Sequence, residues 1–261
     1  MAGFEYYVLR DGWLKLPLQV PAPNGSTYTS GRLLLGLNQL LVRIAGKNIL
    51  IDTGLGEKRA ARDVGLLEIQ TPRRLNNELV ASGITPSDVD IVILSHLHYD
   101  HCGGATLTRA GKLAPSFTNA VYYLQQRELD YVRNLSDPVA SSFFPDDFEL
   151  LLTDGRLKMI AGDYEPLTGL KLHPTGGHTP GHQVVVVQSR AMTLFYPGDM
   201  FATRRHRMMK LSRRHNYDVD ALNTQRKLWS ERARAGGWSC FYCHELRNPV
   251  GQAGSLDRTG I

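Results

Sequence analysis

The sequence predicts an α/β protein, because patterns typical of strands and of helices alternate along the chain. Short branched apolar runs at residues 90–94 and 183–188 have the length and composition of buried strands. Residues 219–235 instead carry apolar side chains at the spacing of a long surface helix. The sequence shows no low-complexity linker between these elements, so we expect one domain covering residues 1–261.

The first half of the chain opens with two strands joined by a glycine turn. An amphipathic helix follows and stops at Gly83, a residue type that commonly ends helices. After a proline turn come a buried strand, a further strand and a second helix. The expected ranges, in order, are 33–43, 47–51, 72–82, 85–88, 90–94, 120–124 and 126–134.

The second half begins with residues 143–154, where no clear pattern is visible. Three strand-like runs then predict a second sheet, and the long surface helix and a last short strand follow. The expected ranges are 170–174, 183–188, 192–196, 219–235 and 241–242.

The composition is that of an ordinary globular protein, with 42% hydrophobic and 21% charged residues. The apolar runs are far shorter than the roughly 20 residues that span a membrane, so we expect no membrane partner. The first 13 residues lack the apolar segment of a signal peptide. With three cysteines, the chain is expected to be cytoplasmic, with free thiols.

The formal net charge of +5 is mild, and much of it lies in one segment that contains no acidic residue. This segment could attract anionic substrates or nucleic acid, but we favour a solvated basic loop. A nucleic-acid partner is disfavoured because aromatic residues are not interleaved with the charges. The basic residues are Arg204, Arg205, Arg207, Lys210, Arg213 and Arg214.

Residues 96–101, with the sequence His-Leu-His-Tyr-Asp-His, carry the strongest functional signal. They follow the buried strand directly, and side chains two residues apart in an extended chain point to the same side. His96 and His98 can therefore face one point, while Asp100 and His101 face a second point once the chain turns. Such a grouping predicts ligands for two adjacent cations, because the clustered groups would otherwise repel one another or shift their pKa values.

Three further residues are candidate ligands. His178 lies in a glycine-rich turn, and Asp199 and His244 each come just after an expected strand. Imidazole and carboxylate ligands suit zinc, and also iron, cobalt or manganese. Because a carboxylate has two oxygens, Asp199 is the candidate bridge between two cations.

These motifs resemble those of the metallo-β-lactamase-fold hydrolases. The matching pieces occur in the family's order and cover most of the chain, and they are residues 51–54, 95–104, 177–182, 198–199 and His244. The resemblance implies a four-layer αββα sandwich, in which two mixed β-sheets are flanked by helices. It also implies two zinc ions per chain, with iron, cobalt or manganese as alternatives.

The resemblance implies a role for each candidate ligand. One metal would take His96, His98 and His178. The other would take Asp100, His101 and His244, and Asp199 would bridge the two. Asp52 would be an outer carboxylate that orients the ligands, although the sequence leaves a plain turn residue open for it.

Within the family the chain is most similar to the quorum-quenching lactonase-like branch, whose relatives include organophosphate hydrolases. The similarity rests on residues 82–90, 95–104 and 177–183. One position departs from the lactonase pattern: Ala202 stands where those enzymes carry a tyrosine that contacts substrate. Either His206 or a tyrosine elsewhere in the chain could take over the substrate contact of the missing hydroxyl.

The expected reaction is hydrolysis of a lactone or related small ester. Two cations about 3.5–4 Å apart lower the pKa of a bridging water and give hydroxide near neutral pH. Asp100 could then carry a proton to the leaving group, and His206 is a second catalytic candidate. A phosphotriester or phosphodiester hydrolase remains the alternative, and a non-catalytic metal-binding protein of the same fold is a further one. A homodimer is also kept open.

The remaining histidines and cysteines have plainer interpretations. We expect His182 to be structural, His173 to lie in a strand and His215 to lie in a loop. Cys102 is interpreted as a small buried residue. Residues 240–244 match a haem-attachment pattern, but haem attachment would require export and would remove His244 from the metal site.

Overall fold

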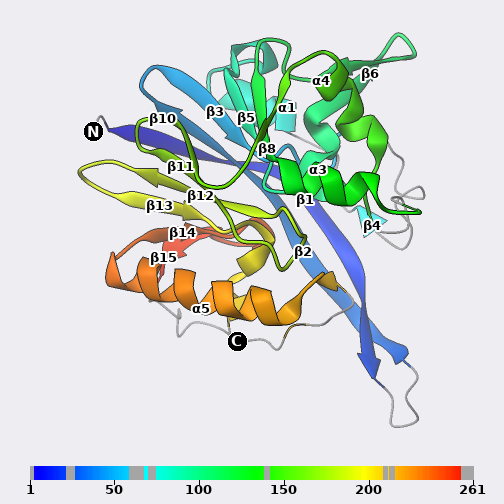
Figure 1. Ribbon diagram of the computed structural model, residues 1–261, viewed down its shortest axis with the longest axis vertical. Helices are drawn as coiled ribbons and strands as arrows, with labels where there is room; N and C mark the ends of the chain where they lie inside the picture. Colours follow the sequence, from blue (N-terminus) through cyan, green and yellow to red (C-terminus); the bar gives the residue numbers. More distant parts are fainter. Residues whose placement is uncertain are drawn as a thin grey trace.

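Two β-sheets pack face to face in the computed structural model, and helices cover their outer faces (Figure 1). The predicted αββα sandwich is therefore confirmed. The expectation of a single domain stays a prediction. The structure describes residues 3–21, 27–58, 68–69, 75–137, 142–207, 211 and 215–253.

The first sheet has seven strands in the order β4-β1-β2-β3-β5-β8-β9. It is mixed, because β4 to β3 pair antiparallel while β3, β5, β8 and β9 run parallel. The parallel strands end at the same edge of the sheet, which is where functional groups gather in such sheets. The strands are β1 Phe4–Pro21, β2 Thr27–Ile44, β3 Lys47–Ile51, β4 Glu68–Ile69, β5 Ile91–Ile93, β8 Val121–Gln125 and β9 Leu157–Ile160.

The second sheet has six strands in the order β10-β11-β12-β13-β14-β15. It too is mixed, because only β13 and β14 pair in parallel. The strands are β10 Tyr164–Leu167, β11 Leu170–Pro174, β12 Gln183–Gln188, β13 Thr193–Tyr196, β14 Ser239–Phe241 and β15 Val250–Gln252. A separate hairpin consists of β6 Thr106–Arg109 and β7 Lys112–Pro115.

Three apolar layers hold the sandwich together. The middle layer lies between the sheets, where Ile49 and Ile93 of the first sheet pack in one cluster with Val185 of the second. On the outside of the first sheet, strand residues pack with helices α1 Leu75–Ala81, α3 Gln126–Arg133 and α4 Glu149–Thr153. Helix α5 Val219–Ala235 covers the second sheet through Leu222, Trp229 and Ala233.

The helix α5 forms over the predicted range, and its N-terminus explains why. The Asp218 carboxylate accepts hydrogen bonds from the backbone N–H groups of Asp220 and Ala221. These two groups would otherwise lack partners in the first turn of the helix. The cap fixes the residue at which the helix begins. The preceding loop, residues 215–218, lies beside the site described below, because the backbone N–H groups of Tyr217 and Asp218 donate to the carbonyls of His178 and Gly177.

The main element that the sequence analysis did not anticipate is β1. It pairs along the length of β2, but its register shifts between Arg10 and Gly12. The Arg-Asp-Gly sequence at this shift has the composition of a turn, which obscures the strand. The range 143–154 contains α4, which is too short to show helical periodicity. Of the predicted helix at 72–82, residues 72–74 lie outside the described part of the chain.

Among the residues that the structure describes, no helix is long and apolar enough to cross a membrane.

Candidate metal centre

Ligand-type side chains from both sheets meet at one end of the sandwich. His96, His98 and the short helix α2 Tyr99–Cys102 follow directly after β5. Asp199 follows β13, in the 3₁₀ turn Gly198–Phe201, and His244 follows β14. Gly198 has φ +52°, a conformation that glycine adopts at little cost, and this lets the chain turn as soon as the strand ends.

The first group consists of His96, His98 and His178, whose ring nitrogens face one another. His98 Nδ1 lies 2.9 Å from His96 Nε2 and 3.1 Å from His178 Nε2. Burial, reinforced by the neighbouring rings, holds the pKa values of His96 and His98 well below the usual range, so both are neutral.

Hydrogen bonds on the far side of these rings show that lone pairs point into the first group. His178 Nδ1 lies 3.0 Å from the side-chain oxygen of Asn216, so its proton is on Nδ1. His96 Nδ1 lies 3.0 Å from Ser95 Oγ, whose own proton goes to Asp52. Two Nε2 lone pairs therefore face His98 Nδ1, which carries at most one proton. A cation would satisfy all three nitrogens, so the donor set fits a metal.

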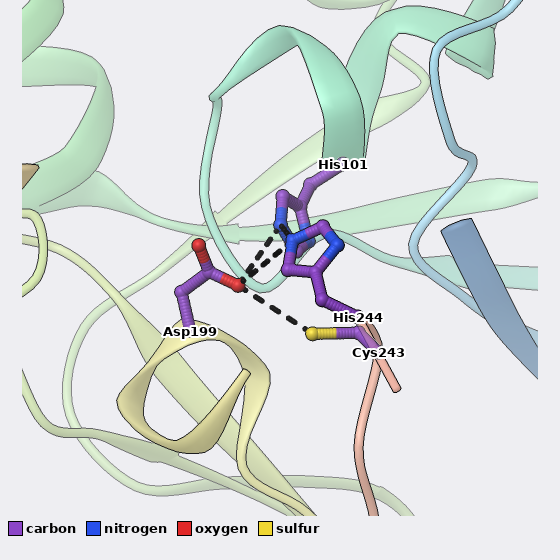
Figure 2. Close-up of side chains that lie close together, drawn as sticks. All are labelled: His101, Asp199, Cys243 and His244. Atoms are coloured by element: carbon purple, nitrogen blue, oxygen red, sulfur yellow. Dashed lines mark hydrogen bonds and ion pairs between the residues drawn. The ribbon is translucent and has the colours of Figure 1, made fainter. Parts of the chain in front are cut away.

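The second group consists of His101, Asp199 and His244 (Figure 2). Asp199 Oδ1 lies 3.2 Å from His101 Nε2 and 3.3 Å from His244 Nε2, and the two nitrogens are 3.3 Å apart. Burial alone would lower the pKa of both histidines, but Asp199 and Asp100 raise it, and for His101 the rise is large. The two rings are thus prone to hold protons at the position that a cation would take.

Asp199 connects the two groups. Its Oδ1 faces His101 and His244, whereas its Oδ2 lies 3.3 Å from His178 Nε2. Burial alone would raise the pKa of Asp199, but the neighbouring histidines hold it well below the usual range. The residue is therefore an anion with one oxygen directed to each group.

Asp100 lies at the edge of the second group. Its Oδ2 is 3.5 Å from His244 Nε2 and 4.0 Å from His101 Nε2, and 18% of its side chain is exposed. The fourth member of the buried cluster is Cys243, whose thiol lies 3.4 Å from Asp199 Oδ1. Burial and the carboxylates around it raise the pKa of the Cys243 thiol well above its usual value.

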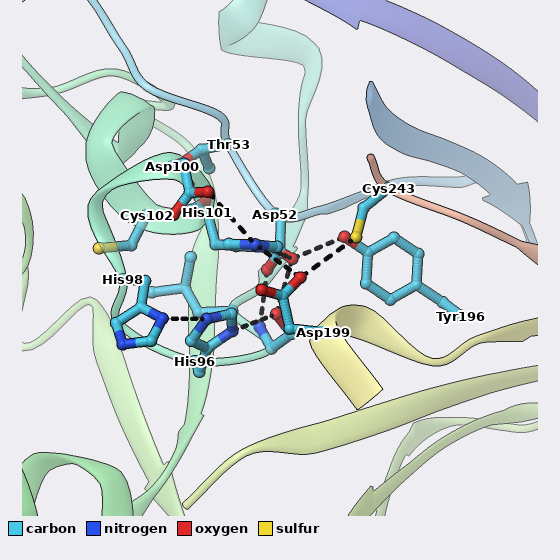
Figure 3. A network of polar contacts seen from close by, with 12 residues as sticks. Asp52, Thr53, His96, His98, Asp100, His101, Cys102, Tyr196, Asp199 and Cys243 are labelled. Atoms are coloured by element: carbon cyan, nitrogen blue, oxygen red, sulfur yellow. Dashed lines mark hydrogen bonds and ion pairs between the residues drawn. The ribbon is translucent and has the colours of Figure 1, made fainter. Parts of the chain in front are cut away.

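Asp52 belongs to neither group, but it contacts residues that do (Figure 3). It is buried, and its Oδ2 accepts hydrogen bonds from Ser95 Oγ at 2.7 Å, Tyr196 OH at 2.6 Å and His101 Nδ1 at 2.7 Å. Its Oδ1 accepts from the Ser95 backbone N–H at 2.7 Å. Because His101 donates through Nδ1 to Asp52, its Nε2 is the nitrogen that faces Asp199, and it can bind a metal once its own proton is displaced.

Two further residues, His244 and Glu128, make hydrogen bonds that fix the positions of the loops around the site. His244 Nδ1 lies 2.8 Å from the Gly36 carbonyl oxygen, which again leaves Nε2 directed into the site. Glu128 is buried on α3 and accepts hydrogen bonds from the backbone N–H groups of Leu97 and Gly181 and from the Thr179 hydroxyl. Glu128 thereby ties the loop that carries His98 to the loop that carries His178.

His206 lies apart from both groups, half-buried in the 3₁₀ turn Arg204–Arg207. Its Nδ1 accepts a hydrogen bond from the Thr203 backbone N–H at 3.2 Å, which places the ring proton on Nε2. Burial lowers its pKa, although the charge of Asp199 opposes this. His206 is therefore neutral and carries an N–H donor, but the structure does not bring it into either group.

The other candidates from the sequence fall where expected. His182 is buried and its Nδ1 lies 2.7 Å from Thr175 Oγ1 in the same loop. His173 lies in β11, His215 lies outside strands and α-helices, and Cys102 is a buried core residue. Of the basic segment, residues 208–210 and 212–214 lie outside the described part of the chain, and Arg204 donates to the Val250 carbonyl at 2.9 Å.

The sequence analysis missed four contributors to the site: Cys243, Asn216, Tyr196 and Glu128. Cys243 had a visible signal, because it precedes a candidate ligand directly. The others had none, because each acts through a partner distant in the chain.

Comparison with known proteins defines the class. Residues 34–231 match the model of the metallo-beta-lactamase superfamily, and the chain belongs to that superfamily. This confirms the family to which the motifs were assigned and agrees with the two mixed sheets.

Individual relatives show which members of the superfamily the chain is similar to. An N-acyl homoserine lactonase of a Bacillus species is 31% identical over 176 residues, which are 63% of this chain and 63% of the relative. The chain thus matches somewhat less than two thirds of the length of that lactonase. The similarity to the lactonase-like branch is confirmed at the level of sequence.

Solved structures agree on the fold. A probable metal-dependent hydrolase from Staphylococcus aureus is 19% identical, with a TM-score of 0.83, and the match covers 95% of this chain and 92% of that one. A dizinc quorum-quenching lactonase, solved with a product, is 20% identical with a TM-score of 0.77, and the match covers 95% and 90% of the two chains.

Proposed function

We propose that this protein is a dinuclear metal hydrolase, with zinc as the metal, that cleaves lactones or related small esters. The observation that carries the proposal is the position of Asp199 between two groups of ring nitrogens, with one carboxylate oxygen directed to each. A single-metal site would not need a carboxylate divided in this way. The lactonase relatives and the dizinc structural neighbour support the same reaction class.

In this proposal His96, His98 and His178 hold one cation, and Asp100, His101 and His244 hold the other, with Asp199 shared. Bound cations would supply Lewis acidity, which lowers the pKa of water and polarises a carbonyl oxygen. The chain's own contribution is to fix the donors before any cation arrives. Asp52 engages Nδ1 of His101, and the Gly36 carbonyl does the same for His244, so that Nε2 of each ring faces the site.

Two residues are proposed to act on the substrate. Asp100 is the most exposed carboxylate of the centre, with 18% of its side chain accessible, so it can carry a proton to the leaving oxygen. His206 lies outside both groups but close enough for the charge of Asp199 to act on it, and we propose that its N–H takes the place of the tyrosine hydroxyl that is absent at Ala202. Ala202 itself is buried and contributes only a methyl group.

The test joins metal analysis to a substrate panel. The purified protein is assayed with an acyl homoserine lactone, a thioester and a bis-aryl phosphate, and its zinc content is measured. We expect about two zinc ions per chain and turnover of the lactone. Asp199→Ala should lower kcat/KM about a thousandfold or more and reduce the zinc content, since it removes the shared ligand. Asp163→Ala, at a carboxylate that is 74% exposed and distant in the sequence, is the matched control.

The panel separates the alternatives. Turnover of the phosphate alone would replace the lactonase with a phosphoester hydrolase. Two bound zinc ions with no turnover of any substrate would indicate a metal-binding protein of the same fold.

A further inference from the structure

Cys243 belongs to the buried cluster around Asp199, together with His101 and His244. It lies between Tyr242 and His244 just after β14, and it is buried. Its sulfur atom points at Asp199 from the same side as His244 (Figure 2). One donor atom each from His101, Asp199, Cys243 and His244 lies within 4.8 Å of all the others.

The spacing of these atoms is that of donors to a common ion. Two nitrogen or oxygen donors bound tetrahedrally to zinc at about 2.0–2.1 Å stand roughly 3.3 Å apart. The distances among His101 Nε2, His244 Nε2 and Asp199 Oδ1 are 3.2 to 3.3 Å. With a zinc–sulfur distance of about 2.3 Å, a sulfur and an oxygen donor stand roughly 3.6 Å apart. Cys243 Sγ is 3.4 Å from Asp199 Oδ1.

Asp100 and Cys243 both lie beside this set of donors, but they differ in burial. The Asp100 side chain is partly exposed, and its nearer oxygen is 3.5 Å from His244 Nε2 and 4.0 Å from His101 Nε2. The Cys243 sulfur is buried and belongs to the tight cluster. The sulfur atom can therefore contribute to this position in addition to the Asp100 carboxylate.

We propose that Cys243 supplies a sulfur donor to the cation held by His101, Asp199 and His244. This inference rests on the proposed dinuclear site, and it specifies which ions that site prefers. When the cation binds, a sulfur–metal bond forms and the thiol proton passes to solvent. A sulfur donor favours zinc, cobalt and cadmium over manganese and magnesium.

The test uses the absorption spectrum of the cobalt form of the full chain. Metal-free protein is titrated with Co²⁺, and a sulfur-to-cobalt charge-transfer band in the near ultraviolet reports sulfur bound to the ion. We expect the band in the wild type and its loss in Cys243→Ser and Cys243→Ala. The matched controls are Cys240→Ser and Cys102→Ser, since both cysteines are buried but neither belongs to the cluster, and both variants should keep the band.

Metal selectivity gives a second readout. Cys243→Ser should bind Cd²⁺ about tenfold or more weakly at one of its two positions, while its affinity for Mn²⁺ changes little. A wild-type chain that binds two Co²⁺ ions without the band, or a Cys243→Ser variant that keeps it, would overturn the inference.

The outcomes distinguish this inference from the proposed function. If the band is present but no ester is turned over, the proposed hydrolase activity is refuted and the proposed sulfur donor is supported. If two ions bind and the lactone is turned over but the band is absent, the proposed sulfur donor is refuted and the proposed hydrolase activity is supported.

Discussion

Replacing Asp52 by asparagine tests whether the metal centre depends on a residue that is not itself a ligand. Asparagine keeps one oxygen, which can still accept the Ser95 backbone N–H, but it puts an NH₂ group in place of Oδ2. Oδ2 is the atom that accepts from Ser95 Oγ, Tyr196 OH and His101 Nδ1. The two hydroxyls can rotate to accept hydrogen bonds from the new group, but a protonated Nδ1 cannot.

The consequence falls on the tautomer of His101. To avoid facing an NH₂ group with its own N–H, the ring gives up the proton on Nδ1 and keeps the one on Nε2. His101 Nε2, which lies 3.2 Å from Asp199 Oδ1, then holds the only proton of the ring, and an incoming cation must displace it against the preferred tautomer. Loss of such an outer partner typically weakens metal affinity about 10- to 100-fold, or about 1.4 to 2.8 kcal/mol. Loss of a charged acceptor also costs the metal-free chain about 2 kcal/mol, a fall in Tm of about 5 °C.

The measurement is a competition between the protein and a chelator for Zn²⁺, followed by thermal unfolding of the metal-free forms. One of the two zinc affinities should fall by the stated factor, while the other changes less because the first group does not contact Asp52 Oδ2 directly. Asp163→Asn is the control, because the Asp163 carboxylate is 74% exposed and pairs only with His173 among the contacts described. Both affinities within twofold of the wild type and an unchanged Tm in Asp52→Asn would refute the reasoning.

Two further predictions concern residues that support the site or face the substrate. Glu128→Gln replaces one carboxylate oxygen by NH₂ and leaves at least one of three donors without an acceptor, so the metal-free chain should lose about 1–3 kcal/mol of stability. An unchanged unfolding midpoint in denaturant would contradict this. His206→Asn should lower kcat about a hundredfold while two zinc ions remain bound. If kcat stays within twofold, His206 serves only to close its own turn through Thr203.

The sequence predicted the parts of the site that are local. The candidate ligands from His96 to His101 come from six consecutive residues after the strand β5, and the turn into the short helix α2 separates His96 and His98 from Asp100 and His101. The strands 47–51, 170–174 and 183–188 and the helix 219–235 have the predicted bounds, because each has a clear apolar pattern.

What the sequence did not predict depends on contacts between distant segments. Asn216 belongs to the site because it meets His178, and Tyr196 belongs because it meets Asp52, 144 residues earlier. A hydrogen-bond partner of this kind has no periodicity or spacing of its own. The strand β1 was hidden for another reason, since its register shift at Arg10 and Gly12 resembles a turn.

The protonation of the two groups leads to a last prediction, that the two cations bind with different dependence on pH. In the first group, burial keeps the pKa values of His96 and His98 well below the usual range, so few protons need to be displaced there. In the second group, carboxylates overcome burial and raise the pKa values of His101 and His244. Protons on these two rings offset the charge of Asp199 until a cation replaces them.

The direction of the pH dependence follows from whether the metal-free or the metal-bound state holds the protons. A histidine whose folded pKa is raised stabilises the metal-free chain fully below about pH 6.5, its unfolded value, and this stability is lost as the pH rises through the folded pKa. Over the same range the affinity of the second group for its cation rises, because fewer protons compete. Calorimetric titration with Zn²⁺ in two buffers of different ionisation enthalpy counts the protons released at each step. Equal release at both steps, or affinities that change equally with pH, would show that the two groups are not protonated differently.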